Sequence, residues 1–169
     1  MLPTKITAAL MGIAAVGAAF AMPMAAQADT PAADTEITER ARGTVVFRTE
    51  RYQLSNRAVV STTPTTIRIV DDSAMTQSGT KAGLFIQLGY AHDPRNPTVL
   101  RINSGVAVRG YDFATGTYRA DQAIQVGEGA LSLDSPLWSD ATHAWGHLGS
   151  QTERGIDIDV HGVHFGSPY

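Results

Sequence analysis

The chain has 169 residues, no cysteine and a net charge of −3, and its lysines and arginines are not clustered. Proteins bind duplex nucleic acid through clustered positive charge, so we do not expect nucleic acid as a partner. Without cysteine, thiol catalysis, disulfide bonds and sulfur-ligated metal centres are excluded as well. The stability of the protein must therefore come from its core or from a bound metal ion.

The first residues have the three parts of an export signal. Lys5 provides a short positive region, residues 6–22 are apolar, and Ala26-Gln27-Ala28 has the small-residue pattern that signal peptidase requires. The apolar run is marginal for a membrane anchor, since a spanning helix needs about 20 residues. We therefore expect cleavage of residues 1–28 and a secreted product with no membrane attachment, or a periplasmic one if the source has an outer membrane. The abundance of alanine, glycine and arginine is typical of a bacterial protein.

The next residues, 29–42, are polar and acidic, and they predict a flexible leader in which order begins near Thr38. From residue 43 to residue 169 we expect a single β domain. Apolar and polar residues alternate there in short runs, for example in residues 65–70 and 84–90, and turn-forming residues separate the runs. This pattern predicts an all-β fold, an antiparallel β-sandwich or barrel of about 8–9 strands.

Residues 136–148 interrupt the β pattern. Ser135 and Pro136 suit the beginning of a helix, an apolar stripe with helical spacing follows, and Gly149 suits its end. Gly146 opposes a helix, because glycine costs about 1 kcal/mol relative to alanine inside one. We expect a short helix here, with a long aromatic loop as the alternative.

The histidines of this segment are candidate metal ligands. On a helix, Asp140, His143 and His147 would share one face, and two histidines and one carboxylate form a common metal site. The alternative is a solvated helix face that holds two histidines by chance. The sequence lacks the HExxH arrangement and every other complete metal signature.

A second group of candidate ligands lies in residues 156–161. Isoleucine and valine alternate there with aspartate and histidine, as in a strand with one buried and one solvated face, so the polar residues need no ligand to explain them. Across a sheet they could nevertheless join the earlier histidines around a transition metal. The metal site predicted in this way consists of His143, His147, Asp159 and His161.

Aromatic residues are candidates for a different ligand. Exposed aromatic rings on a β fold can stack on sugars, although filling the core is their ordinary role. The residues predicted to contact a ligand are Tyr111, Tyr118, Trp138 and Trp145. In a hairpin, Tyr111, Phe113 and Tyr118 would face one another across a glycine-containing turn.

No complete catalytic motif is present, since the chain lacks a G-x-S-x-G elbow, a P-loop and an EF-hand loop. We therefore expect a non-enzymatic secreted module that needs no cofactor and binds a glycan, a protein or a small ligand outside the cell. The alternative is a small metal-dependent or acid/base enzyme that uses histidines between residues 143 and 164. A secreted inhibitor or toxin, with residues 71–81 as its contact loop, is a further alternative.

The export signal predicts the first residue of the mature protein. When the full chain is expressed in an export-competent bacterium, the product outside the cytoplasm should begin at Asp29, which intact-mass spectrometry measures. Ala28→Phe should block this cleavage because a large side chain does not fit the peptidase. Gln27→Phe should leave cleavage intact, because the residue between the two small ones is not selected. Accumulation of a product that still begins at Met1 would contradict the prediction.

Overall fold

The computed structural model describes residues 36–136, 140–150 and 155–162. These residues form eleven strands and one 3-10 turn, η1 (Ala120–Gln122). In chain order the strands are β1 (Ile37–Arg40), β2 (Arg42–Phe47), β3 (Glu50–Gln53), β4 (Val59–Thr62), β5 (Thr66–Thr76), β6 (Lys81–His92), β7 (Val99–Arg109), β8 (Ala123–Val126), β9 (Glu128–Leu133), β10 (His143–Gly149) and β11 (Ile156–His161). Every pairing between them is antiparallel.

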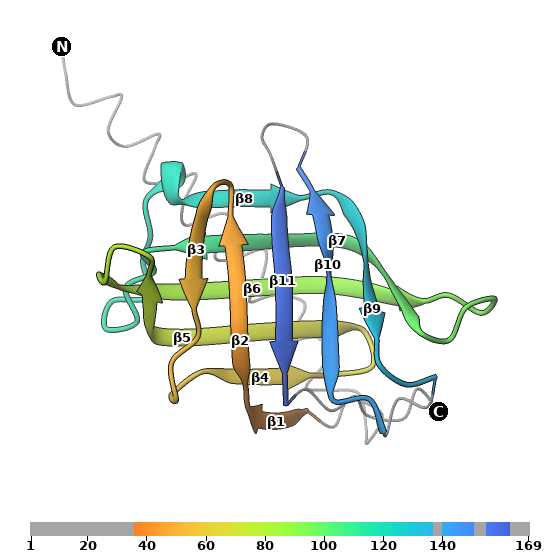
Figure 1. The fold of residues 1–169 in the computed structure, drawn as a ribbon. Coiled ribbons are helices and arrows are strands. Elements are labelled where there is room, and N and C mark those ends of the chain that lie inside the picture. The colour runs from red at the N-terminus through yellow and green to blue at the C-terminus, as the bar shows by residue number, and fades with distance from the viewer. Residues whose placement is uncertain (1–35, 137–139, 151–154, 163–169) are drawn as a thin grey trace, which may run out of the picture.

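Eight of the strands close into a barrel (Figure 1). Around the barrel the order is β5, β3, β2, β11, β10, β9, β7 and β6, and β6 pairs with β5 to close the sheet. The three other strands, β1, β4 and β8, have four residues each: β4 adds to β5, β1 adds to β4, and β8 adds to β7. The predicted antiparallel β fold is confirmed as a barrel, and the strand count exceeds the expected one because of these short additions.

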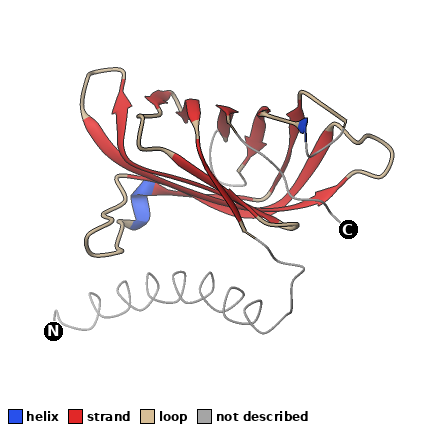
Figure 2. Cartoon of the chain, turned by 90° about the horizontal axis from the view of Figure 1, so that it is seen from below, coloured by secondary structure: helices blue, strands red, loops and turns tan. Residues whose placement is uncertain are grey.

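Three long strands form one layer of the barrel. β5, β6 and β7 have 11, 12 and 11 residues, and β2, β3, β10 and β11 run across them in Figure 1. Figure 2 shows the long strands as a curved trough beneath the shorter ones. One edge of β7 is divided, since residues 99–102 pair with β9 and residues 105–108 pair with β8. The edge of β5 is divided in the same way between β4 and β3. At each division one neighbour continues round the barrel and the other extends the long layer.

The core confirms the alternation expected from the sequence. In β6 the residues at alternate positions from Leu84 to Tyr90 are all at most 2% exposed, and β11 buries its two isoleucines and its valine in the same manner. Burying a side chain of this size contributes roughly 1.5–3 kcal/mol. The largest fully buried side chains are Phe47, Ile67, Ile69, Leu84, Ile86, Leu88, Leu100, Ile124, Leu131, Leu148 and Ile156.

Asp71 is the most deeply buried acid of the described residues, at 1% exposed. Its carboxylate accepts hydrogen bonds from the Ser55 amide at 2.6 Å, the Ser55 hydroxyl at 2.7 Å and the Ser73 amide at 3.0 Å. A buried charge is tolerated when it is hydrogen-bonded in this way. Asp71 also stands at the register shift of β5 between Asp71 and Ala74, so it ties the loop after β3 to that irregularity.

β1 lies at the end of the expected leader, near Thr38, where order was expected to begin, and it pairs with β4; residues 29–35 lie outside the described residues. One local expectation differs from the structure. The helix expected at 136–148 is wrong over residues 143–148, which belong to strand β10, while residues 137–139 lie outside the described residues. Ala144 and Leu148 are buried as predicted, but a spacing of four places residues on one face of a strand as well as of a helix.

Glycine at position 146, which is unfavourable in a helix, is explained by the packing of strand β10 against β9. A Cβ atom at this position would lie 2.2 Å from the carbonyl oxygen of Ala130 in β9. At Gly149, in the same strand, the nearest atom to an added Cβ would be the Glu128 carbonyl oxygen at 3.6 Å, which is an ordinary contact. The close approach of β9 and β10 therefore requires glycine at position 146 and not at position 149.

Gly146→Ala should therefore lower the free energy of unfolding by about 1–3 kcal/mol, the usual cost of an added methyl group in a packed place. Urea unfolding followed by circular dichroism measures the change, and Gly149→Ala is the matched control that should stay close to the parent protein. Equal stability of Gly146→Ala and Gly149→Ala would contradict the close approach of β9 and β10.

His92 ends β6 and packs edge-on against Tyr90, with ring centroids 5.2 Å apart. Burial lowers the pKa of His92 from 6.5 to about 4. Because the folded-state pKa lies below the unfolded one, the unfolded chain takes up this proton first as the pH falls. The contribution of the neutral ring to stability is therefore complete above about pH 6.5 and is lost progressively toward pH 4.

Comparison with His92→Gln isolates this effect. Between about pH 7 and about pH 4, the parent protein should lose up to about 2 kcal/mol more unfolding free energy than His92→Gln, a figure reduced for the partial exposure of the ring. Urea unfolding at a series of pH values gives the two curves. If the unfolding free energies of the parent protein and His92→Gln changed with pH in the same way, burial of His92 would not destabilise its protonated form as predicted.

Candidate functional site

The candidate metal ligands lie on the outer face of β10 and β11. In both strands the small and aliphatic residues point into the barrel and the polar residues and one tryptophan point outward. The strands are neighbours in the barrel, and their antiparallel register sets the outward residues opposite one another. The three cross-strand pairs are His143 with His161, Trp145 with Asp159, and His147 with Asp157.

Three of these side chains converge, and we call them the His–Asp–His cluster: His143, Asp159 and His161. Nε2 of His143 lies 2.8 Å from Oδ1 of Asp159, and Nε2 of His161 lies 3.5 Å from the same oxygen. The two imidazole rings are stacked, with centroids 3.9 Å apart and planes 13° apart. One ligand atom from each residue lies within 4.8 Å of the others.

His147, the fourth predicted ligand, is not part of this cluster. Its Nδ1 lies 2.7 Å from Oδ1 of Asp157, so the two residues form a separate pair further along the same strands. The helical site of Asp140, His143 and His147 is also wrong, because His143 and His147 lie in a strand. Residues four apart in a strand are separated by roughly 13 Å, too far to hold one ion.

Two residues that the sequence did not single out position the cluster. Asp134 accepts hydrogen bonds from the Thr142 amide at 2.9 Å, the Thr142 hydroxyl at 3.0 Å and the His143 amide at 3.2 Å, and so fixes the beginning of β10. Desolvation alone would raise the pKa of Asp134, but these hydrogen bonds outweigh it and lower the pKa. The only sequence signal for this role was an aspartate at the end of an alternating run.

Gly43 positions the other side of the cluster. It has a φ of +138°, and a Cβ atom there would lie 2.1 Å from the backbone oxygen of Asp159. β2 can therefore lie close against the part of β11 that carries the cluster carboxylate, and Thr44 of β2 pairs directly with Asp159. A glycine at the start of a strand gave no sequence signal of this contact.

The donor types suit a small transition-metal ion, and the stacked imidazole rings must turn for both to bind it, because a ring nitrogen binds a metal in the plane of its ring. Zinc binds histidine nitrogen and carboxylate oxygen at about 2.0–2.2 Å, so two ligand atoms of a tetrahedral ion lie roughly 3.3 Å apart. The two nitrogen–oxygen distances in the cluster, 2.8 and 3.5 Å, lie on either side of that value. Imidazole and carboxylate suit zinc, copper and nickel. Three protein ligands would leave at least one coordination position for water or a further ligand.

Solvent reaches the cluster from outside the barrel. The side chains of His143, His161 and Asp159 are 24%, 44% and 56% exposed. The same contacts also serve as ordinary cross-strand hydrogen bonds, which are worth little at exposed positions. A measurement of metal affinity therefore distinguishes a metal site from two ordinary surface contacts of His143 and His161 with Asp159.

The aromatic residues predicted to bind a ligand fall into two places. Trp145 is 38% exposed and its ring lies 4.4 Å from that of His143, centroid to centroid, so it borders the cluster. Tyr111 and Tyr118 lie instead in the turn that follows β7, and Trp138 lies outside the described residues. Tyr111 and Tyr118 therefore do not share a binding surface with Trp145.

The expected hairpin of residues 111–118 is present, with a β-bridge between Asp112 and Thr117. Tyr111 packs against Tyr118 at 6.0 Å, Phe113 at 4.6 Å and Phe85 at 5.0 Å between ring centroids. Phe85 belongs to β6, so these rings fasten the hairpin to the barrel. Because its ring contacts three other aromatic rings, Tyr111 packs the hairpin against β6.

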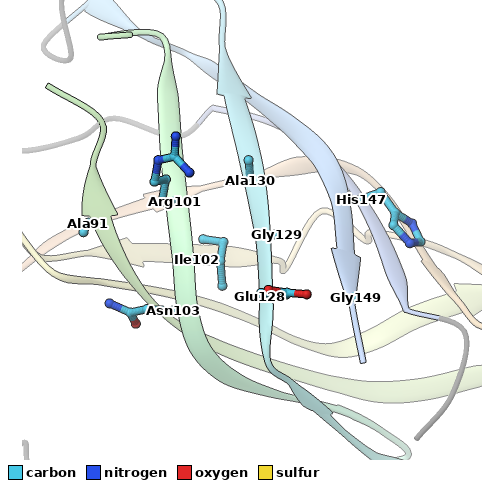
Figure 3. Close-up of a pocket in the computed structure, with 9 residues that line it drawn as sticks. All are labelled: Ala91, Arg101, Ile102, Asn103, Glu128, Gly129, Ala130, His147 and Gly149. Atoms are coloured by element: carbon cyan, nitrogen blue, oxygen red, sulfur yellow. The ribbon is translucent and has the colours of Figure 1, made fainter. Parts of the chain in front are cut away.

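A shallow groove of about 770 Å³ runs across the outer side of β7, β9 and β10 (Figure 3). Its ionisable side chains are Arg101, Glu128 and His147, and in Figure 3 they lie apart from one another. Arg101 makes its ion pair with Asp93, at 2.8 Å, and His147 pairs with Asp157. The groove therefore offers no convergent set of chemical groups.

Comparison of the chain with protein-family models, with curated proteins and with solved structures gave no match. Among the described residues, no helix has the length and apolar character needed to cross a membrane.

Proposed function

We propose that this protein is an exported binding module that holds a divalent transition-metal ion on the outside of its barrel through the His–Asp–His cluster. The observation that carries the proposal is the convergence of His143 and His161 on one oxygen of Asp159. Export is supported by the signal-like residues 1–28. The proposed partners are the metal ion and a further ligand or protein outside the cell.

The scaffold orders the backbone of the site before the ion arrives, so that only the side chains must turn to bind it. All three ligands stand on two neighbouring strands whose register is held by a fully buried inner face. A site on paired strands positions its ligands better than a site on loops, because the backbone is already ordered. The ion would therefore bind with little loss of chain entropy, which compensates in part for having three protein ligands.

The exposure of the cluster favours binding over catalysis. A catalytic metal site usually lies in a dry, shaped cavity that excludes water and orients the substrate. Here the ligand side chains stand on the outer face of the barrel, a quarter to just over half exposed. The open coordination position would face solvent, where a side chain of a partner could fill it, and the exposed Trp145 would border that contact.

The proposal predicts one metal ion per chain. After treatment of the mature protein with a chelator, isothermal titration with Zn²⁺, Ni²⁺ and Cu²⁺ should give a single strong site for at least one of them. His143→Ala and His161→Ala should each weaken that site at least about tenfold, since each removes one of three ligands. Elemental analysis of the purified protein provides an independent count.

His147→Ala is the matched control, because it removes a histidine of the same face that is paired with Asp157 and does not reach the cluster. It should leave the metal affinity unchanged. Cu²⁺ should also quench the fluorescence of Trp145, which borders His143, and Trp145→Phe should reduce this quenching without changing the affinity. The absence of stoichiometric binding, or an equal loss in His147→Ala, would reject the proposal.

A further inference from the structure

A second group of polar side chains lies at the end of the barrel where β5 turns into β6, and we call it the mouth pocket. Its volume is about 370 Å³, and it is about as open to solvent as the groove across β7, β9 and β10. The mouths of β-barrels are frequent ligand sites. The residues used below are Glu50, Tyr52, Thr76, Arg109, Arg119 and Asp121, all of which line it.

The strand register shows that this pocket opens from the inside of the barrel. Tyr52 pairs directly with Thr76, and both side chains are buried. Arg109 pairs directly with Leu84, which is fully buried in the core. Directly paired residues of antiparallel strands point to the same face, so Arg109 points inward at the end of β7. A charged residue directed into a barrel is unusual and requires partners.

Glu50 provides one of these partners and leaves hydrogen-bonding capacity unused. Its Oε2 accepts the Tyr52 hydroxyl at 2.7 Å and Nη1 of Arg109 at 3.2 Å. The other carboxylate oxygen of Glu50 makes no hydrogen bond to the part of the chain that the structure describes. Arg109 also lies within hydrogen-bond reach of the Tyr52 hydroxyl, and its guanidinium carries five N–H donors in all, more than these two contacts use. Burial, together with Glu50, raises the pKa of Tyr52 to about 12, so this hydroxyl remains a donor.

The charges of the mouth pocket balance one another. Arg109 is paired with Glu50, and Arg119 is paired with Asp121 through two hydrogen bonds. Two cations and two anions leave no net charge to attract an ion. A free acceptor on Glu50 and free donors on the adjacent Arg109 instead suit a neutral group that both donates and accepts hydrogen bonds, and a hydroxyl is such a group.

We propose that the mouth pocket binds a small, neutral, polyhydroxylated ligand, a sugar ring or a polyol, whose neighbouring hydroxyls bridge Glu50 and Arg109. One hydroxyl donates to the free oxygen of Glu50 and the next accepts from Arg109. Thr76 and Ser78, whose hydroxyl oxygens lie 2.9 Å apart, supply further polar contacts on the wall. This site uses β3, β5, β6 and β7, so it is independent of the metal proposal on β10 and β11.

Nuclear magnetic resonance of the ¹⁵N-labelled mature protein tests the proposal. Glucose and sorbitol, each added to about 100 mM so that millimolar affinity is visible, should give saturable amide shifts at Glu50, Tyr52, Thr76 and Arg109 for at least one of them. Glu50→Gln keeps the shape of the side chain and removes its charge, and it should weaken the binding about tenfold or more. Asp72→Asn is the control, because it removes a carboxylate whose ion pair with Arg57 lies outside the pocket.

Other outcomes overturn the proposal. Sodium acetate and sodium phosphate serve as anionic probes, and larger shifts at the same amides with either one would identify an anion site. Absence of saturable shifts with both glucose and sorbitol, or unchanged affinity in Glu50→Gln, would also reject a polyhydroxyl site. Should Glu50→Gln lose its dispersed spectrum, Arg109→Lys provides the second variant, since lysine keeps the charge but loses the guanidinium donors and should bind more weakly.

Discussion

The strict alternation of inward and outward side chains in the closed barrel is the constraint on which the rest of the structure depends. β10 and β11 bury Ala144, Leu148 and the aliphatic residues of β11, and this burial fixes their register. A slip of one residue would exchange the faces and bring imidazole and carboxylate groups into the core. The outward convergence of His143, Asp159 and His161 is therefore determined by the packing on the opposite side of the same strands.

The His–Asp–His cluster and the mouth pocket both contain paired charged or polar groups, but their surroundings differ. On the outer face, contacts between histidine and aspartate are solvated and contribute little to stability, so their value is in the donor atoms that they bring together. In the mouth pocket, Arg109 and Glu50 are 28% and 39% exposed, and Arg109 also lies 5.7 Å from the ring of the fully buried Phe47. There the guanidinium of Arg109 and the carboxylate of Glu50 stabilise each other at a place that is only partly hydrated.

Most of the fold, and only part of the site, could be predicted from the sequence. Alternation in residues 84–90 and 156–161 correctly identified buried and solvated faces, because a period of two depends only on local order. The segment around Gly146 was misassigned because spacings of four fit both a helix and a strand, and the contact with Ala130 that explains this glycine is not local. The cluster included only three of four predicted ligands, since a register between strands is invisible in the sequence. Gly43 and Asp134 were missed for the same reason.

The short strands β1 and β8 have a bearing on how the protein behaves when it is concentrated. Within the described residues they are the strands that have a single neighbour, and each is only four residues long. A free edge of that length presents few unpaired amide and carbonyl groups on which another molecule could extend the sheet. Closure of eight strands into a barrel, combined with such brief edges, leaves this cysteine-free β-rich chain little free sheet edge on which fibrillar association could begin.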